Sequence, residues 1–262
     1  MVLSPSEVNL KEDNVSSDKR RGIIFAYDKS TFDDRDERLL RKIAPYIDIV
    51  KIGLQAMFAY DPSGFTVATL VRRVVVEDLN KKVMWDAKLN DIPNTVGAAA
   101  ENIVKMPGIR FFTVHASSGF GALVAAQKAA QETKSIPLVV TVLTSLDDEE
   151  CVSIFGNMPD EKVLRFVHSA RRAGISDIVC SPKDLAFLAK QGITSSSFNF
   201  VTPGVRLSDS APDDQKRTLT VTEAVRAGAS YIVIGRPIAG ALHPAFAAQA
   251  IRKEFDKAIR SL

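Results

Sequence analysis

The strongest constraint on the fold is a repeated alternation of short apolar segments with longer amphipathic ones. Eight segments of four to seven residues are rich in β-branched and aromatic side chains, which is typical of buried strands. Helical periodicity separates them, for example over 33–46, 54–79 and 244–260. Strands separated by helices pair in parallel, and eight of them predict an α/β fold closed into a (β/α)8 TIM barrel. The expected strands are 22–27, 48–52, 82–85, 109–114, 137–143, 177–180, 198–201 and 231–234.

An open, doubly wound sheet is the structural alternative. No GxGxxG motif follows the first expected strand, which removes the main reason to prefer that fold. No linker or internal repeat interrupts residues 21–262, so we expect one barrel domain there. Residues 1–20 are polar with mixed charge, and we expect them to form a mobile N-terminal tail.

Composition excludes several classes of partner. The net charge is only +3, and the lysines and arginines are scattered, so we expect no nucleic-acid partner. No apolar run approaches the roughly 18 residues of a membrane span, and no signal peptide is evident. Cys151 and Cys180 form no CxxC pattern, which favours a reduced, cytoplasmic setting. The three histidines lie far apart without metal-ligand spacing, so no metal site is predicted.

The stretch 85–95, WDAKLNDIPNT, holds the densest group of charged residues at a strand end. Side chains two apart on a strand share a face, so Asp86 and Lys88 project together, and Asp91 follows just past the strand. Pro93 is expected to end regular structure, with Asn94 or Thr95 capping the next helix. Carboxylates around an ammonium in a partly buried site tend to be functional, whereas a solvated surface ion pair is the alternative.

Other polar residues stand where expected strands end, the face on which barrel active sites lie. Lys51 lies among β-branched residues and needs a partner such as Asp86 or Asp91, unless it reaches water. Thr144 could orient a ligand or cap a turn, while His115 is interpreted as a packed histidine outside the site.

A phosphate site is expected after the eighth strand. A glycine lets the backbone approach an oxyanion, and an arginine adds a fork of donors, which Gly235 and Arg236 would supply. The long polar loop 203–218 carries Arg206 and Gln215 and could close over the same phosphate. Phosphates commonly bind after the last strands of such barrels.

Taken together, these segments resemble the orotidine 5'-phosphate decarboxylase family. The run 86–95, DAKLNDIPNT, is similar to the family signature DxKxxDIPNT. Segments 141–145 (TVLTS), 201–206 (VTPGVR), 214–215 (DQ) and 234–237 (IGRP) resemble its other blocks in the same order. The resemblance runs from about residue 22 to the final helix and implies a stand-alone, bacterial-type enzyme with no cofactor.

The resemblance implies conversion of orotidine 5'-phosphate to UMP and CO2, with Lys88 protonating the C6 carbanion. Asp86 would face the substrate's carboxylate, and Lys51 would lie between the aspartates. It also implies a homodimer with shared active sites, in which Asp91 and Thr95 reach into the neighbouring subunit's site. The implied catalytic residues are Lys88, Asp86, Lys51 and Asp91; the implied substrate-binding residues are Asp28, Lys51, Asp86, Asp91, Ile92, Thr95, Thr144, Arg206, Gln215, Gly235 and Arg236.

Two other functions compete with this one. A metal-dependent sugar-phosphate decarboxylase or aldolase of the same barrel superfamily would share DxKxxD, but resembles the chain less at 92–95 and 144–145. A barrel that only binds nucleotides would be expected to lack a site charge, yet Lys51, Asp86, Lys88 and Asp91 are all present.

Overall fold

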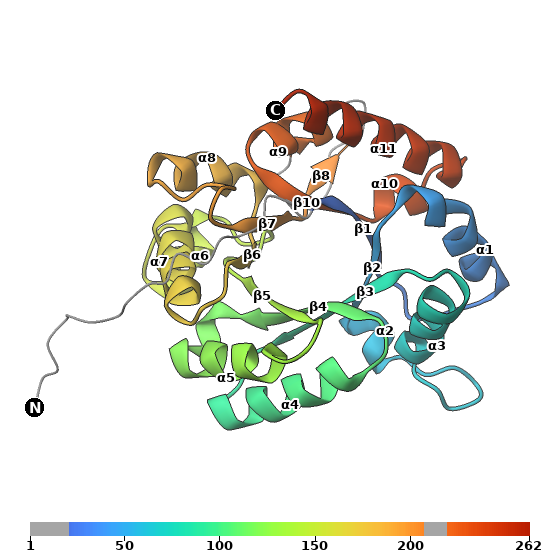
Figure 1. Ribbon diagram of the computed structural model, residues 1–262, viewed down its shortest axis with the longest axis horizontal. Coiled ribbons are helices and arrows are strands. Elements are labelled where there is room, and N and C mark those ends of the chain that lie inside the picture. Colours follow the sequence, from blue (N-terminus) through green and yellow to red (C-terminus); the bar gives the residue numbers. More distant parts are fainter. Residues whose placement is uncertain (1–20, 207–218) are drawn as a thin grey trace, which may run out of the picture.

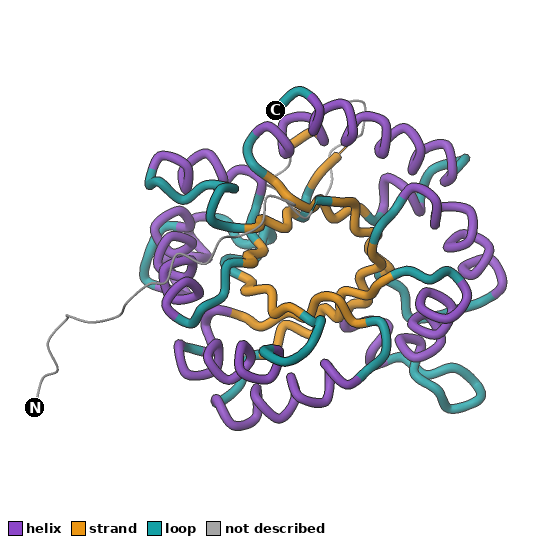
Figure 2. The backbone as a smooth tube through the Cα atoms, in the orientation of Figure 1, coloured by secondary structure: helices purple, strands orange, loops and turns teal. Residues whose placement is uncertain are grey.

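Eight parallel strands close into a barrel with helices around its outside (Figure 1). The structure is a computed structural model, and it describes residues 21–206 and 219–262. Around the barrel the strands follow chain order, and the last one pairs with the first. Figure 2 shows the strands as a closed ring inside the helices. This arrangement confirms the predicted (β/α)8 barrel, while the expected mobile tail at 1–20 lies outside the described residues.

The barrel strands are β1 (Gly22–Tyr27), β2 (Ile49–Gly53), β3 (Lys82–Leu89), β4 (Ile109–His115), β5 (Ile136–Val140), β6 (Asp177–Val179), β7 (Asn199–Thr202) and β10 (Ala229–Ile234). A short pair, β8 (Val205–Arg206) and β9 (Leu219–Thr220), flanks the undescribed segment 207–218. The α-helices are α1 (Asp34–Ile43), α2 (Leu54–Phe58), α3 (Val67–Arg73), α4 (Pro93–Lys105), α5 (Phe120–Ala130), α6 (Asp148–Phe155), α7 (Pro159–Arg172), α8 (Pro182–Lys190), α9 (Val221–Arg226), α10 (Arg236–Ala239) and α11 (Pro244–Arg260). None of these described helices is long and apolar enough to cross a membrane.

Local sequence explains where many of the helices begin. Four N-cap residues form capping boxes, in which the cap side chain and the side chain three residues later satisfy each other's backbone N–H groups. Several other helices start with proline in the first turn, where its missing N–H costs nothing. The four capping residues are Asp33, Asp147, Ser181 and Thr220.

The core has two layers because alternate strand residues face opposite sides of the barrel wall. On β10, Ile232 and Ile234 join the large cluster between the barrel and its helices, while Tyr231 and Val233 join the small cluster inside. That interior cluster fills the barrel and leaves the carboxyl ends of the strands to form the site. Its buried members are Ile24, Ala26, Ile49, Met84, Phe111, Leu138, Val201, Tyr231 and Val233.

Three local expectations were wrong. The helical stretch expected over 54–79 is split into α2, α3 and a π-helical turn at Val74–Asp78. The interruption is a turn over 61–64, where the Asp61 carboxylate accepts from the Phe65 N–H at 2.8 Å and Gly64 has φ +86°. The fifth strand ends at Val140, three residues earlier than expected.

The third error concerns the region after β3. Pro93 does not end regular structure but begins α4, because its fixed φ suits the first helical position. The N-cap is therefore Ile92, which makes no side-chain cap, and neither Asn94 nor Thr95 caps the helix. β3 itself continues to Leu89, so both Asp86 and Lys88 lie within the strand.

Candidate active site

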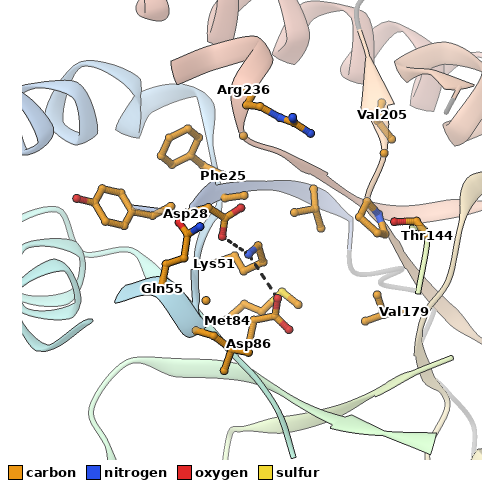
Figure 3. Close-up of a pocket in the computed structure, with 18 of the residues that line it drawn as sticks. Phe25, Asp28, Lys51, Gln55, Met84, Asp86, Thr144, Val179, Val205 and Arg236 are labelled. Atoms are coloured by element: carbon orange, nitrogen blue, oxygen red, sulfur yellow. Dashed lines mark hydrogen bonds and ion pairs between the residues drawn. The ribbon is translucent and has the colours of Figure 1, made fainter. Parts of the chain in front are cut away.

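A cavity of about 720 Å³ lies at the carboxyl ends of the barrel strands (Figure 3). Its polar lining comes from separate elements: the ends of β1, β2 and β3, the loop after β5, and the turn after β10. Seven residues predicted from the sequence line it together. These are Asp28, Lys51, Asp86, Lys88, Thr144, Gly235 and Arg236.

At one end of the cavity, which we call the charged floor, carboxylates and ammonium groups alternate in the order Asp28, Lys51, Asp86 and Lys88. The Lys51 Nζ lies 2.6 Å from Asp28 Oδ1 and 3.4 Å from Asp86 Oδ2 (Figure 3). The Lys88 Nζ donates to the same Asp86 Oδ2 at 2.9 Å. Lys51 thus pairs with Asp28 and Asp86, and Asp86 holds two lysines at one oxygen.

Gly53 allows the pair at the end of β2 to form. A Cβ atom there would lie 3.0 Å from Asp28 Oδ1 and 3.2 Å from Lys51 Nζ. Any larger residue would therefore press against the ion pair, and glycine leaves room for it.

Burial and charge compete in setting the protonation of this cluster. Burial alone would raise the pKa of Asp86, but the charges of Lys51 and Lys88 and hydrogen bonds from Lys88 and Thr113 lower it overall. Burial would likewise lower the pKa of Lys51, but the carboxylates of Asp86 and Asp28 raise it overall. Both groups are therefore charged at neutral pH.

The backbone of β3 is distorted where it carries these groups. Lys88 has φ +47°, a left-handed conformation that costs a residue with a Cβ about 1–2 kcal/mol. Across the ladder, Trp85 faces Phe112 and Leu89 faces Val114, so β3 holds two more residues here than β4. The bulge presents both Asp86 and Lys88 to the cavity, and bulges often redirect side chains at active sites.

The phosphate end predicted after β10 also lines the cavity. A Cβ atom at Gly235 would lie 3.2 Å from both the Cβ and the carbonyl oxygen of Ala26, so this position needs glycine to pass β1. Arg236 follows as the first residue of α10 and extends over the cavity opposite the charged floor (Figure 3).

Comparisons with known proteins agree with this geometry. The sequence model of the Orotidine 5'-phosphate decarboxylase / HUMPS family matches residues 22–251. The chain belongs to this family. It is 36% identical to orotidine 5'-phosphate decarboxylase of Geotalea daltonii over 241 residues, 90% of this chain and 96% of that protein. It is 38% identical to that of Moorella thermoacetica over 229 residues, 84% of this chain and 86% of that protein.

A solved relative in this family has the same barrel. The crystal structure of orotidine 5'-phosphate decarboxylase from Lactobacillus acidophilus matches with a TM-score of 0.71 and 29% identity. The match covers 90% of this chain and 99% of that one. The family membership and fold predicted from the sequence are confirmed.

Some predicted family residues lie away from this chain's cavity. Asp91 and Ile92 are exposed on the connection between β3 and α4, and Thr95 is exposed in the first turn of α4. The Asp91 carboxylate accepts from the Ile92 N–H at 2.7 Å. Arg206 is described only as part of β8, and Gln215 lies outside the described residues.

His115, which the sequence left out of the site, does not line the cavity. Burial, together with the charge of Lys88, lowers the pKa of its imidazole, so the ring is neutral at pH 7. Its Nδ1 lies 2.7 Å from the Ser117 Oγ, which holds the ring at the end of β4.

Sequence reasoning missed two residues at or next to this cavity. Gln55 on α2 lines the cavity beside Asp28 (Figure 3). Thr113 on β4 bonds to both Asp86 and Lys88 from behind the cavity wall. Strand alternation could have placed Thr113 on the inner face, because it lies two residues after the interior residue Phe111. Its hydrogen-bond partners could not have been predicted, because they depend on the bulge in β3.

Proposed function

We propose that this cavity converts orotidine 5'-phosphate to UMP and CO2, with Lys88 as the proton donor. The assignment of the chain as an orotidine 5'-phosphate decarboxylase, a carboxy-lyase of pyrimidine biosynthesis, is confirmed by the family model and by the relatives. The observation that carries the residue-level proposal is the alternating order Asp28–Lys51–Asp86–Lys88 at one end of the cavity.

The chemistry requires a cation that also carries a proton. Loss of CO2 from C6 of the pyrimidine leaves a carbanion with little delocalisation, so a fixed ammonium beside C6 stabilises it and then protonates it. Lys88 suits this role because its side chain is one-third exposed to the cavity and paired with Asp86. Asp86 faces the substrate's carboxylate and orients the Lys88 ammonium through their 2.9 Å contact.

Binding contacts come from the rest of the cavity. In this proposal Asp28 and Lys51 hold the ribose hydroxyls and Thr144 contacts the pyrimidine. Binding energy from contacts to the substrate's phosphate group, remote from C6, helps to orient the pyrimidine ring over Lys88. The residues proposed to hold the phosphate are Arg206, Gln215, Gly235 and Arg236.

A second part of the proposal is a cytoplasmic homodimer with shared active sites. Ile92 is an apolar residue with 65% of its surface exposed, next to the exposed Asp91 and near Thr95. Such a group fits a contact with a second copy, in which Asp91, Ile92 and Thr95 complete the partner's cavity.

Turnover of orotidine 5'-phosphate, followed by loss of its ultraviolet absorbance, tests the function directly. Because Lys88 supplies the cation, we propose that the reaction needs no metal or organic cofactor, and turnover should survive exhaustive treatment with EDTA. The alternative expected from the sequence is a metal-dependent sugar-phosphate decarboxylase or aldolase of the same barrel superfamily. Activity that disappears with EDTA and returns with magnesium would favour that activity instead.

Mixing two inactive variants tests the shared site. Lys88→Ala and Asp91→Ala homodimers should each be nearly inactive. After subunit exchange, each mixed dimer contains one intact site if Lys88 and Asp91 come from different subunits. Random pairing makes half of the dimers mixed, so activity should recover to roughly a quarter of wild type. No recovery after demonstrated exchange would exclude sharing.

A further inference from the structure

The hydroxyl of Thr113 connects the two residues that carry the proposed chemistry. Thr113 lies on β4, is fully buried and does not line the cavity. Its Oγ1 accepts from the backbone N–H of Lys88 at 2.8 Å and donates to Asp86 Oδ1 at 3.0 Å. One side chain therefore contacts both ends of segment 86–88, which supplies two of the charged residues at the cavity floor.

Thr113 stands where the strand ladder is interrupted. Between the pairs Trp85–Phe112 and Leu89–Val114, three residues of β3 face the single residue Thr113. A bulge leaves backbone groups without regular ladder partners. The Thr113 hydroxyl provides a partner for the N–H of Lys88, the residue whose φ is +47°.

The direction of these hydrogen bonds follows from the chemistry of a hydroxyl. It carries one proton, so when its oxygen accepts from Lys88 the proton is available for Asp86. Asp86 Oδ1 is thereby held, and Oδ2 faces the ammonium groups of Lys88 and Lys51. The terminal torsion of an aspartate is broad and roughly two-fold, so this contact selects one orientation of the carboxylate.

We propose that Thr113 is a positioning residue for the decarboxylation, fixing the Asp86 carboxylate and the Lys88 backbone so that the ammonium is held at C6. This inference rests on the proposed function. Thr113 acts through the two charged residues, since it does not line the cavity that would hold the substrate. Small displacements of catalytic groups are costly, so the contact matters for rate.

Thr113→Val tests the proposal because it keeps the shape and removes both hydrogen bonds. We expect kcat to fall on the order of 100-fold, as misplaced catalytic groups do. KM for orotidine 5'-phosphate should change little, because ribose and phosphate contacts come from other strands. Affinity for UMP, which lacks the C6 carboxylate, should also stay near that of the wild type. Thr113→Ser, which keeps the hydroxyl, should restore most of kcat.

Thr202→Val is the matched control. Thr202 on β7 is also fully buried, and its hydroxyl donates to the Tyr231 carbonyl at 3.2 Å, away from the charged floor. Its kcat should match wild type. If the valine variant at 113 folds poorly, Thr113→Ser and Thr113→Ala carry the comparison, because both lack the methyl group and differ only in the hydroxyl.

Wild-type kcat in folded Thr113→Val, or equal kcat in the serine and alanine variants, would overturn the positioning role. An equal loss in Thr202→Val would also overturn it, because the effect would then belong to barrel packing. These results differ from failure of the proposed function, in which the wild-type protein itself would release no CO2 from orotidine 5'-phosphate.

Discussion

The two ends of the barrel use acidic and basic side chains in different ways. At the amino-terminal end, Asp48 accepts from the Ile23 N–H at 2.7 Å and pairs with Arg252 of α11. Arg252 also donates to the Tyr46 carbonyl at 3.0 Å. At the carboxyl end, Asp86 pairs with two lysines on a bulged strand.

The difference lies in burial and in what the charges join. The Asp48 side chain is 41% exposed, and its contacts tie the last helix to the first strands. The Asp86 side chain is 7% exposed, and its contacts join groups of adjacent strands around a cavity. Buried ion pairs are weak sources of stability, since desolvation offsets much of their attraction. We therefore expect the carboxyl end to govern rate and the amino-terminal end to govern stability.

Lys88→Met should have the largest effect on rate if the carboxyl end of the barrel serves catalysis. It removes both the proton donor and the cation beside C6, so kcat should fall by about 10⁴-fold or more, the combined range for these effects. The free energy of unfolding should change by less than about 1 kcal/mol, because Lys88 is partly exposed and Asp86 keeps Lys51.

The matched control is Lys82→Met, at the exposed start of the same strand, which should leave kcat unchanged. The measurements are single-turnover decarboxylation and urea unfolding. A Lys88→Met protein with kcat near wild type would remove Lys88 from the proton-donor role.

Arg236→Ala separates the phosphate end of the cavity from its charged floor, because Arg236 lies opposite that floor (Figure 3). Loss of a charged, bidentate contact to phosphate should lower kcat/KM for orotidine 5'-phosphate. The corresponding loss of transition-state stabilisation should be about 3 kcal/mol. Turnover of orotidine, which lacks the phosphate, should barely change. Steady-state kinetics on both substrates measures this, and equal losses would show that Arg236 acts through folding or the reacting centre.

The sequence predicted the barrel because eight apolar segments and the helices between them are local signals. Regular strand alternation also predicted that Asp86 and Lys88 project together, and in the structure a bulged strand presents both to the cavity. The turn over 61–64 was not foreseen within an apparently helical stretch, although Pro62 and Gly64 are typical turn residues. Pro93 was predicted to end regular structure, whereas its fixed φ suits the first position of α4.

The bulge in β3 could not have been predicted from local sequence. No glycine marks it, and Lys88, which has a positive φ, donates its N–H to Thr113 of neighbouring β4. The contribution of Thr113 depends on this register and was therefore invisible in the sequence. The exposure of Asp91 is likewise a property of the folded chain, and its proposed role needs a second subunit.

Arg252→Met should have the smallest effect and tests the amino-terminal end of the barrel. It removes the ion pair with Asp48 and the hydrogen bond to the Tyr46 carbonyl, while Asp48 keeps the Ile23 N–H. Because this pair is partly exposed, the free energy of unfolding should fall by only about 1 kcal/mol. The values of kcat and KM should not change, because the site lies at the opposite end of the barrel.

Lys253→Met, an exposed neighbour on α11, is the matched control and should unfold like the wild type. Urea unfolding and steady-state kinetics on the same samples decide the matter. If Arg252→Met lowered kcat while leaving stability intact, the two ends of the barrel would be coupled. The division of rate and stability between them would then be wrong, because loss of the contacts between α11 and the first strands would have altered the charged residues of the cavity.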